Sequence, residues 1–249
     1  MQWGYLSISL SLVQINLKVK SSFLWKEIQI FNVCFDYVLA SFTNRSVSSC
    51  ALTTCIGQET PYRSSIATTI ITFNGNPNDR TGYVTGILIG ANYAYYPGYV
   101  LQGIYFALSG LTYTQYLNLN LAQQSFTVEV WINMPAFANQ TDFGLFGQCD
   151  AYNVCMSLSV RNQRLTFSLN SMNTNNITLT GATVLVGNAW YHVAIVYDAT
   201  QYQQLLYVNG QLDALSSGMV SAYQGDPATT ITTIGRSNSF AFPNSYFYG

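Results

Sequence analysis

Residues 190–198 constrain the fold of this chain more than any other stretch. Their apolar side chains point to both sides, with Tyr191, Val193, Ile195 and Tyr197 on one face and Trp190, Ala194 and Val196 on the other. A strand that is covered on both faces has this pattern, so we expect it in the middle of a sheet. The next apolar run ends in Asn209-Gly210. This dipeptide supplies the two positive φ angles of a type I′ turn and predicts a hairpin that returns through residues 211–215.

Short strands separated by turn signals continue on both sides of this hairpin. Residues 125–134 alternate most clearly, with Phe126, Val128, Val130 and Ile132 on one face, and Pro135 ends the run. We expect further strands at residues 66–73, 100–108, 113–119, 143–146, 154–160, 164–169, 177–179 and 229–234. No stretch beyond Tyr62 has helical periodicity over three turns. The pattern predicts an all-β domain over residues 62–249.

The composition limits the classes of partner. Charged residues make up 8% of the chain, against about 25% in an average globular protein. The formal net charge of −1 gives no electrostatic basis for binding nucleic acid or an anionic membrane. A surface built from Tyr, Asn, Gln and Thr suits neutral hydroxylated ligands or adhesive contacts. The alternative is that this is simply the composition of an extracellular β-rich domain.

The first 61 residues do not share the strand pattern. Residues 3–17 are apolar but too short to span a bilayer, and their basic residues follow the apolar run, which is wrong for a signal peptide. A second apolar run, residues 28–42, is interrupted by Asp36. Residues 44–63 are rich in Ser, Thr, Cys and Gly, as linkers are. We expect an N-terminal segment and linker of undefined structure over residues 1–61, with no membrane insertion.

The five cysteines favour disulfides over a metal site. Cys149 and Cys155 are six residues apart, so a disulfide between them could join the ends of two strands. Cys50 and Cys55 form a similar local pair, and Cys34 is left over. The spacings do not match a zinc site, and the chain has a single histidine. Local disulfides would place the protein in an oxidising compartment.

Three sequons for N-glycosylation begin at Asn44, Asn139 and Asn176, each in polar, loop-like sequence. Such tripeptides also arise by chance in a chain rich in Asn, Ser and Thr. Together with the cysteine pairs they favour an extracellular location, either secreted or on a cell surface.

Several motifs, in order, resemble the laminin G-like module of the concanavalin A-like lectin/glucanase group. They are Ile71-Thr-Phe-Asn-Gly75 with Asp79-Arg-Thr-Gly82, residues 103–119, Ser-Phe-Thr-Val-Glu-Val-Trp131, Leu145-Phe-Gly, Arg164-Leu-Thr-Phe167, residues 190–198, Leu206-Tyr-Val-Asn-Gly210 and Ile234-Gly235. The resemblance covers residues 65–249. It implies a jelly-roll β-sandwich of two antiparallel sheets, one of them concave, with residues 125–134 and 190–198 in the middle of the sheets.

The resemblance breaks off at the C-terminus. The module of that family continues past the glycine matched by Gly249 into a further strand with an Ile-Asp-Glu-like segment, whereas this sequence stops there. We therefore expect a sandwich that lacks its final strand, or a fragment of a longer protein. An open sheet edge of this kind would invite strand addition.

The residues do not favour hydrolysis. Glucanases of the resembled group hold two carboxylates on a Glu-x-Asp-x-x-Glu strand, but Glu129 is followed by Trp131 and Met134 at those positions. We interpret Glu129 as a strand residue hydrogen-bonded to a neighbour and His192 as a structural histidine. Trp131 and Trp190 could stack on a sugar ring, although core packing is the simpler interpretation.

Calcium is the one cofactor that the resemblance raises, because several members of the group bind it at the rim of a sheet. Asp79 is the candidate ligand, since its loop is rich in Asn and Gly and has free carbonyl groups. The alternative, which we favour, is that Asp79 caps its own turn. Asp198, at a strand end, is likewise a turn initiator.

These observations lead to a non-catalytic extracellular module that binds carbohydrate or a protein partner. A structural or adhesive spacer in a larger extracellular protein is the alternative, and a degenerate glycoside hydrolase is the least favoured. A concave face with exposed aromatics and amides would indicate glycan binding, and a concave face filled with small or aliphatic residues would indicate a spacer.

Overall fold

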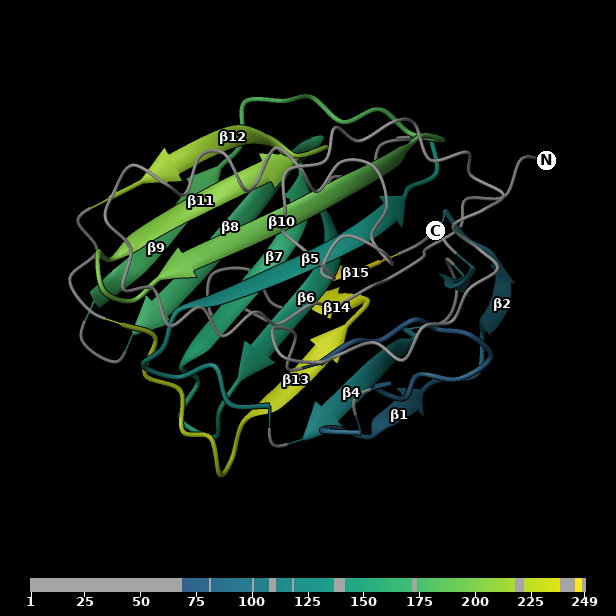
Figure 1. The fold of residues 1–249 in the computed structure, drawn as a ribbon, viewed down its shortest axis with the longest axis horizontal. Helices are drawn as coiled ribbons and strands as arrows, with labels where there is room; N and C mark the ends of the chain where they lie inside the picture. The colour runs from purple at the N-terminus through teal and green to yellow at the C-terminus, as the bar shows by residue number, and fades with distance from the viewer. Residues whose placement is uncertain are drawn as a thin grey trace, which may run out of the picture.

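Two antiparallel sheets stacked face to face form the molecule (Figure 1). The computed structural model describes residues 69–80, 82–99, 101–107, 111–117, 119–136, 142–171, 174–217, 222–237 and 245–247. In that part of the chain the regular elements are all strands, and no helix is long and apolar enough to cross a membrane. The all-β antiparallel sandwich expected from the sequence is confirmed.

The strands divide unequally between the sheets. They are β1 (Gly86–Ile89), β2 (Tyr93–Pro97), β3 (Gln102–Phe106), β4 (Tyr113–Leu117), β5 (Phe126–Asn133), β6 (Asp142–Cys149), β7 (Cys155–Arg161), β8 (Arg164–Ser171), β9 (Thr174–Thr180), β10 (Trp190–Asp198), β11 (Gln203–Val208), β12 (Gln211–Ser216), β13 (Ile231–Ile234), β14 (Arg236–Ser237) and β15 (Ser245–Tyr246). One sheet has seven strands in the order β1-β4-β13-β6-β7-β8-β9, and the other has four in the order β12-β11-β10-β5. Figure 1 shows the four-stranded sheet in front of the larger one. The pairs β2-β3 and β14-β15 are separate two-stranded ribbons.

The core lies between the two sheets and follows the alternation in the sequence. Val128, Val130 and Ile132 of β5 are at most 4% exposed, and Val193 and Ile195 of β10 are fully buried. They belong to one apolar cluster with the inward side chains of the larger sheet, which are Met156, Leu158, Val160, Leu165 and Phe167. Each such side chain contributes about 1.5–3 kcal/mol by leaving water, so this cluster determines which face of each strand points inward.

The hairpin after β10 has the geometry that Asn-Gly predicts. Asn209 and Gly210 have φ angles of 50° and 75°, as a type I′ turn requires, and they connect β11 to β12. The Asn209 amide donates to the His192 carbonyl at 2.7 Å, and the Asn209 side-chain oxygen accepts from the His192 amide at 2.9 Å. Asn209 is therefore hydrogen-bonded to β10 through both its backbone amide and its side chain, which holds the turn against that strand.

The larger sheet joins segments that are distant in the sequence. β13 lies between β4 and β6, so that Thr233 pairs with Gln115 on one side and with Gly147 on the other. The Thr114 hydroxyl also donates to the carbonyl of Ile234 at 3.5 Å. The middle of this sheet thus depends on a strand from near the C-terminal end.

The segment before β1 differs from the expectation. Residues 69–73, which fall in a predicted strand, form only an isolated bridge between Ile71 and Asp79. Phe73 has a φ of 50°, which interrupts an extended backbone, and the amide of Ile70 is bound by the Asp79 carboxylate instead of a strand. The prediction also missed β1, a run of only four residues, and β2, whose tyrosines lack a clean period-two pattern. β3 and β4 were predicted, but they do not pair with each other.

The position of β5 corrects the other expectation about the sheets. β10 is central, between β11 and β5, as predicted, but β5 is the outermost strand among the described residues of its sheet. The resemblance had implied a central position for it. The boundary near residue 62 and the missing final strand stay predictions, because residues 61–68, 248 and 249 lie outside the described part.

Candidate functional site

The outer side of β5 and β10 carries a group of large side chains. We define the tryptophan face as Glu129, Trp131 and Asn133 of β5 with Trp190 and His192 of β10. The pairing places Trp190 opposite Asn133 and His192 opposite Trp131. Both tryptophans are half-buried and neither belongs to the core cluster, so the expectation of core packing was wrong. The cause is the period of the strand, which points them away from Val130 and Val193.

A tyrosine from the loop between β2 and β3 lies on this face. The Tyr99 ring stacks on the indole of Trp131, with centroids 3.8 Å apart and planes 13° from parallel, and lies 6.2 Å from the ring of Trp190. The Tyr99 side chain is nevertheless 52% exposed. One face of its ring is thus held by Trp131 while much of the side chain remains in contact with solvent.

The imidazole of His192 is neutral at physiological pH. Burial lowers the pKa of His192 to about 4, although His192 Nε2 is 3.6 Å from Glu129 Oε2. A carboxylate this close favours the imidazolium, but the loss of hydration at a side chain that is only 11% exposed outweighs it. The pair is therefore a polar contact rather than an ion pair at pH 7, in keeping with the structural role expected for His192.

Two buried polar atoms of the tryptophan face lack a hydrogen-bond partner. They are Trp131 Nε1, a donor, and Asn133 Oδ1, an acceptor, and Asn133 is 7% exposed. An unsatisfied buried polar atom costs roughly 1–3 kcal/mol. The face can therefore gain from a group that accepts one hydrogen bond and donates another.

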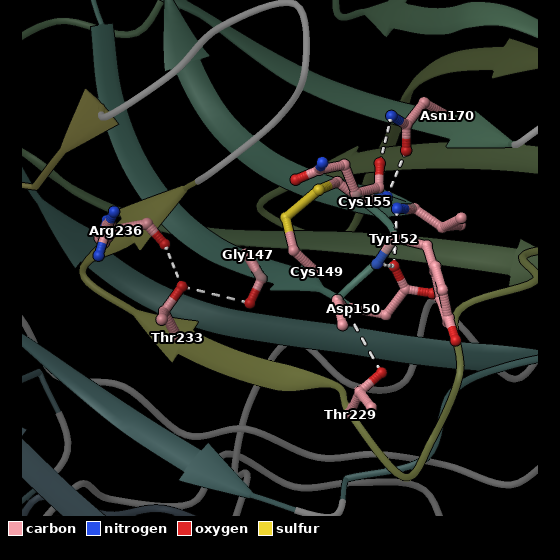
Figure 2. The surroundings of a disulfide bond; sticks show 12 residues. Gly147, Cys149, Asp150, Tyr152, Cys155, Asn170, Thr229, Thr233 and Arg236 are labelled. Carbon is pink, nitrogen blue, oxygen red and sulfur yellow. Dashed lines mark hydrogen bonds between the residues drawn. A yellow bond between two sulfur atoms is a disulfide. The ribbon is translucent and has the colours of Figure 1, made fainter.

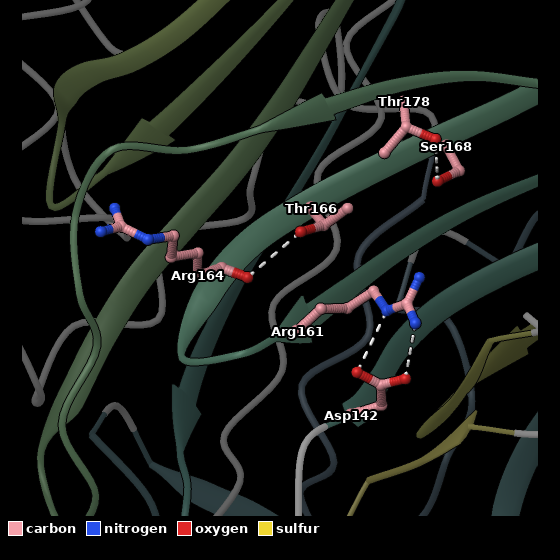
Figure 3. A network of polar contacts seen from close by, with 6 residues as sticks. All are labelled: Asp142, Arg161, Arg164, Thr166, Ser168 and Thr178. Carbon is pink, nitrogen blue, oxygen red and sulfur yellow. Dashed lines mark hydrogen bonds and ion pairs between the residues drawn. The ribbon is translucent and has the colours of Figure 1, made fainter.

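The outer side of the seven-stranded sheet carries hydroxyl groups instead. Their rows follow the register, with Ser157 beside Ser168 beside Thr178, and Ser159 beside Thr166 beside Thr180. Figure 3 shows two of the hydrogen bonds on this side: the Ser168 and Thr178 oxygens are 3.1 Å apart, and the Thr166 hydroxyl donates to the Arg164 carbonyl at 3.3 Å. This hydroxyl face meets part of its hydrogen-bonding need internally, in contrast to the tryptophan face.

One end of the hydroxyl face is closed by an ion pair. The Arg161 guanidinium donates to both carboxylate oxygens of Asp142, at 3.0 and 2.9 Å (Figure 3). Both side chains are about one quarter exposed, and a bidentate arrangement fixes them in a single geometry. The pair links β6 to β7 and leaves Arg161 less available to an external anion.

The carboxylate of Asp79 binds backbone amides around its own loop. Its carboxylate accepts backbone hydrogen bonds from Ile70 at 2.6 Å, Tyr83 at 2.9 Å and Val84 at 3.4 Å. These are the contacts of the turn-capping alternative. Within the described ranges no three His, Cys, Asp or Glu side chains are grouped as metal ligands would be. A calcium ion at Asp79 stays a prediction.

Two further candidates can be located. Asp198 accepts from the amides of Thr200 and Gln201 at 2.7 and 3.1 Å, which is the predicted turn-initiating role. Asn176 lies within β9 at an edge of the larger sheet, not in a loop as we expected. Asn44 and Asn139, and likewise Cys34, Cys50 and Cys55, lie outside the described residues.

The cysteine pair at the β6–β7 turn is a disulfide, Cys149–Cys155 (Figure 2). Asp150 organises the turn that it closes, because its carboxylate accepts from the amides of Tyr152 and Val154 at 2.8 and 2.9 Å and from Asp226 at 2.9 Å. The disulfide and the aspartate thus hold this turn against the segment that leads into β13. We interpret the assembly as structural.

The architecture defines an all-β sandwich of the lectin-like kind. A family model for this kind of domain, of the laminin G type, matches residues 108–249. The chain belongs to the concanavalin A-like lectin/glucanases superfamily. Among curated proteins, none matches the sequence.

Comparison with solved structures gives only distant similarities, in several organisms. Domain 4 of AbnA, an extracellular GH43 arabinanase from Geobacillus stearothermophilus in complex with arabinotriose, has 16% identity and a TM-score of 0.49, covering 70% of this chain and 84% of that one. The CBM40 of the Ruminococcus gnavus IT-sialidase, bound to α2,3-sialyllactose, has 18% identity and a TM-score of 0.41, over 49% and 69%. Mouse laminin α1 domains LG4-5 have 13% identity and a TM-score of 0.42, over 52% and 35%. Nothing about the ligand of this chain follows from similarities this low.

The sequence did not reveal every part of the tryptophan face. Tyr99 was not singled out, because its contact with Trp131 depends on how a loop folds over a sheet. Asn133 was not singled out either, although its outward position follows from the alternation of β5. The pairing of β5 with β10 brings Glu129, Trp131 and His192 together, which no local pattern reveals.

Proposed function

We propose that this domain is an extracellular carbohydrate-binding module, and that it binds its ligand on the tryptophan face together with Tyr99. The observation that carries the proposal is the Tyr99–Trp131 stack beside Trp190 on the outside of a rigid sheet. Flat aromatic surfaces next to polar groups are typical of sites that recognise hydroxylated rings through stacking and hydrogen bonds. Membership of a lectin-containing superfamily and the Cys149–Cys155 disulfide are consistent with this role outside the cell.

The mechanism that we propose is recognition without covalent chemistry. Glycoside hydrolysis by two carboxylates needs a second acid facing Glu129 on the same strand face. Trp131 and Met134 occupy the positions where the glucanase motif has acids, and the Glu129 carboxylate has the neutral imidazole of His192 beside it, 3.6 Å away. The strand therefore offers a binding surface and not a pair of catalytic carboxylates.

A protein partner is the second candidate, and a particular observation supports it. On the other half of the same sheet, the exposed side of β12 carries Leu212 and Leu215, which are 38% and 51% exposed. An aliphatic edge of this kind suits a contact with another protein or a neighbouring module. It would make the domain a spacer or adhesive unit if no glycan binds.

A glycan array probed with the full chain tests the proposal, once with calcium and once with chelator. We expect binding that persists in chelator, because the tryptophan face needs no metal. Binding should be lost in Tyr99→Ala and kept in Tyr152→Ala, a matched control in which an exposed tyrosine (66%) is removed from the β6–β7 turn of the other sheet. Binding that requires calcium would instead favour a calcium-assisted site, with Asp79 as the candidate ligand. No binding by a folded protein would favour the protein partner.

A further inference from the structure

We infer that the ligand of the tryptophan face is a neutral saccharide, which packs a ring against Tyr99 and exchanges hydroxyl hydrogen bonds with Trp131 and Asn133. This inference rests on the proposed function and specifies it. Three independent observations support it: the geometry of Tyr99, the two unpaired buried atoms, and the charge of the sheet.

Tyr99, rather than either tryptophan, offers the ring surface. The indole of Trp131 is already covered on one side by Tyr99, at 3.8 Å between centroids. A ligand can therefore extend the stack on the solvent side of the Tyr99 ring, whose side chain is 52% exposed. The contact with Trp131 orders this ring in advance and so reduces the entropy that binding would otherwise cost.

The two unpaired atoms have opposite hydrogen-bonding character. Trp131 Nε1 can only donate and Asn133 Oδ1 can only accept. A hydroxyl group can serve both, since it is a donor and an acceptor at once, and a sugar ring presents several of them. A polyhydroxylated ring that reaches them would satisfy buried groups that the protein leaves unpaired, and for that reason the gain in affinity would exceed that of a hydrogen bond at the surface.

The charge of the sheet opposes acidic sugars. β5, β10, β11 and β12 contain no Lys or Arg, and their charged residues are Glu129, Asp198 and Asp213. His192 supplies no positive charge at neutral pH, because burial keeps its imidazole unprotonated. Specific recognition of a sialic or uronic carboxylate normally uses arginine or several donors. Like-charge repulsion on this face would instead discriminate against it.

The test uses the full chain in calorimetric titration with defined trisaccharides. Maltotriose, cellotriose and arabinotriose are the neutral probes, and sialyllactose and trigalacturonate are the acidic ones. Tyr99→Ala should weaken neutral binding by about 10-fold, whereas Tyr99→Phe, which keeps the ring, should change it by less than about 2-fold. Trp131→Phe keeps an aromatic six-membered ring beneath Tyr99 and loses the pyrrole half of the indole with its N–H, so we expect a loss of about 3–10-fold. Asn133→Leu, which removes the amide at similar volume, should give a similar loss.

The outcomes separate this inference from the proposed function. Unchanged neutral binding in Tyr99→Ala and Trp131→Phe, with both variants as heat-stable as the wild type, would overturn the inference and leave a carbohydrate module with its site elsewhere. Tighter binding of the acidic probes would also overturn it. If no trisaccharide binds in the titration and no glycan binds on the array, both this inference and the proposed function are overturned.

Discussion

Gln204 is a polar side chain placed inside the sandwich. It is fully buried on the inner side of β11, opposite Tyr197, and neither its amide oxygen nor its amide nitrogen has a hydrogen-bond partner. Two unpaired polar atoms of this kind cost the folded state free energy that an apolar side chain of similar volume would not. We expect Gln204→Met to raise the free energy of unfolding by roughly 1–3 kcal/mol in urea titration.

The neighbouring glutamine provides the control for this substitution. Gln203→Met changes the same residue type at a half-buried position, where water can satisfy the amide, and should change stability by less than about 0.5 kcal/mol. A loss of stability in Gln204→Met would mean that the amide is satisfied, for instance by an internal water molecule.

His192 makes stability depend on pH in the acidic range. Its pKa is lowered to about 4 in the folded state by burial, against an ordinary value of about 6.5. Above pH 6.5 it is neutral in both states and has no effect. Between pH 6.5 and 4 the unfolded chain takes up a proton that the folded chain refuses, and roughly 3 kcal/mol of stability is lost. We expect this loss in urea titrations across that range.

His192→Gln isolates the contribution, because the chain has one histidine. The variant should be less sensitive to pH between 6.5 and 4 than the wild type, while the carboxylates that do not contact residue 192 contribute equally to both proteins. Parallel pH profiles for the two proteins would show that His192 titrates normally in the folded state.

Among the elements, the β11–β12 turn depends on one glycine. Gly210 has a φ of 75°, a conformation that costs a residue with a Cβ atom about 1–2 kcal/mol. Gly210→Ala should lower the free energy of unfolding by that amount. Gln211→Ala, at an exposed position one residue further on, should have little effect. Equal stability of the two variants would contradict a type I′ turn here.

The β6–β7 turn is held by an aspartate as well as by a disulfide. Replacing Cys149 and Cys155 with serine should cost about 2 kcal/mol, because the closed loop is short. Asp150→Ala removes the acceptor of three backbone amides and should cost roughly 2–4 kcal/mol, measured by urea unfolding. Asp150→Asn keeps the Oδ1 acceptor and should lose about half as much. A larger cost for the cysteine pair than for Asp150→Ala would reverse this ranking.

For the whole molecule, the sequence predicted well what is local and poorly what depends on distant contacts. The alternation of residues 125–134 and the Asn-Gly turn identified β5 and the hairpin, because side-chain period and backbone conformation are local properties. β1 was missed because a run of four residues is too short to show a period, and β2 was missed because its tyrosines do not alternate with polar residues. The edge position of β5 could not be deduced, since strand order is set by contacts between remote segments.

In the candidate site, too, local features could be predicted from the sequence and features that depend on distant contacts could not. The outward direction of Trp131 and Trp190 follows from the alternation of side chains along their strands. We nevertheless favoured core packing for both tryptophans, because they are apolar residues in strands rich in apolar residues. Three other features depend on the meeting of the β2–β3 loop, β5 and β10: the stack with Tyr99, the lowered pKa of His192 and the unpaired atoms. No local sequence pattern predicts that these three segments meet.

The place of β13 in the larger sheet has a consequence for how the chain is made. During synthesis β4 and β6 leave the ribosome long before β13, the strand that lies between them. Their facing edges therefore have no partner strand until residues 231–234 have also left the ribosome. Pairing across such long sequence separations is slow, since loop closure must precede any gain from contact. The nascent domain therefore passes through a period in which a strand from another copy could pair with these edges. A chaperone that covers them until residues 231–234 have left the ribosome would protect the yield, whereas slow translation just before residue 231 would lower it.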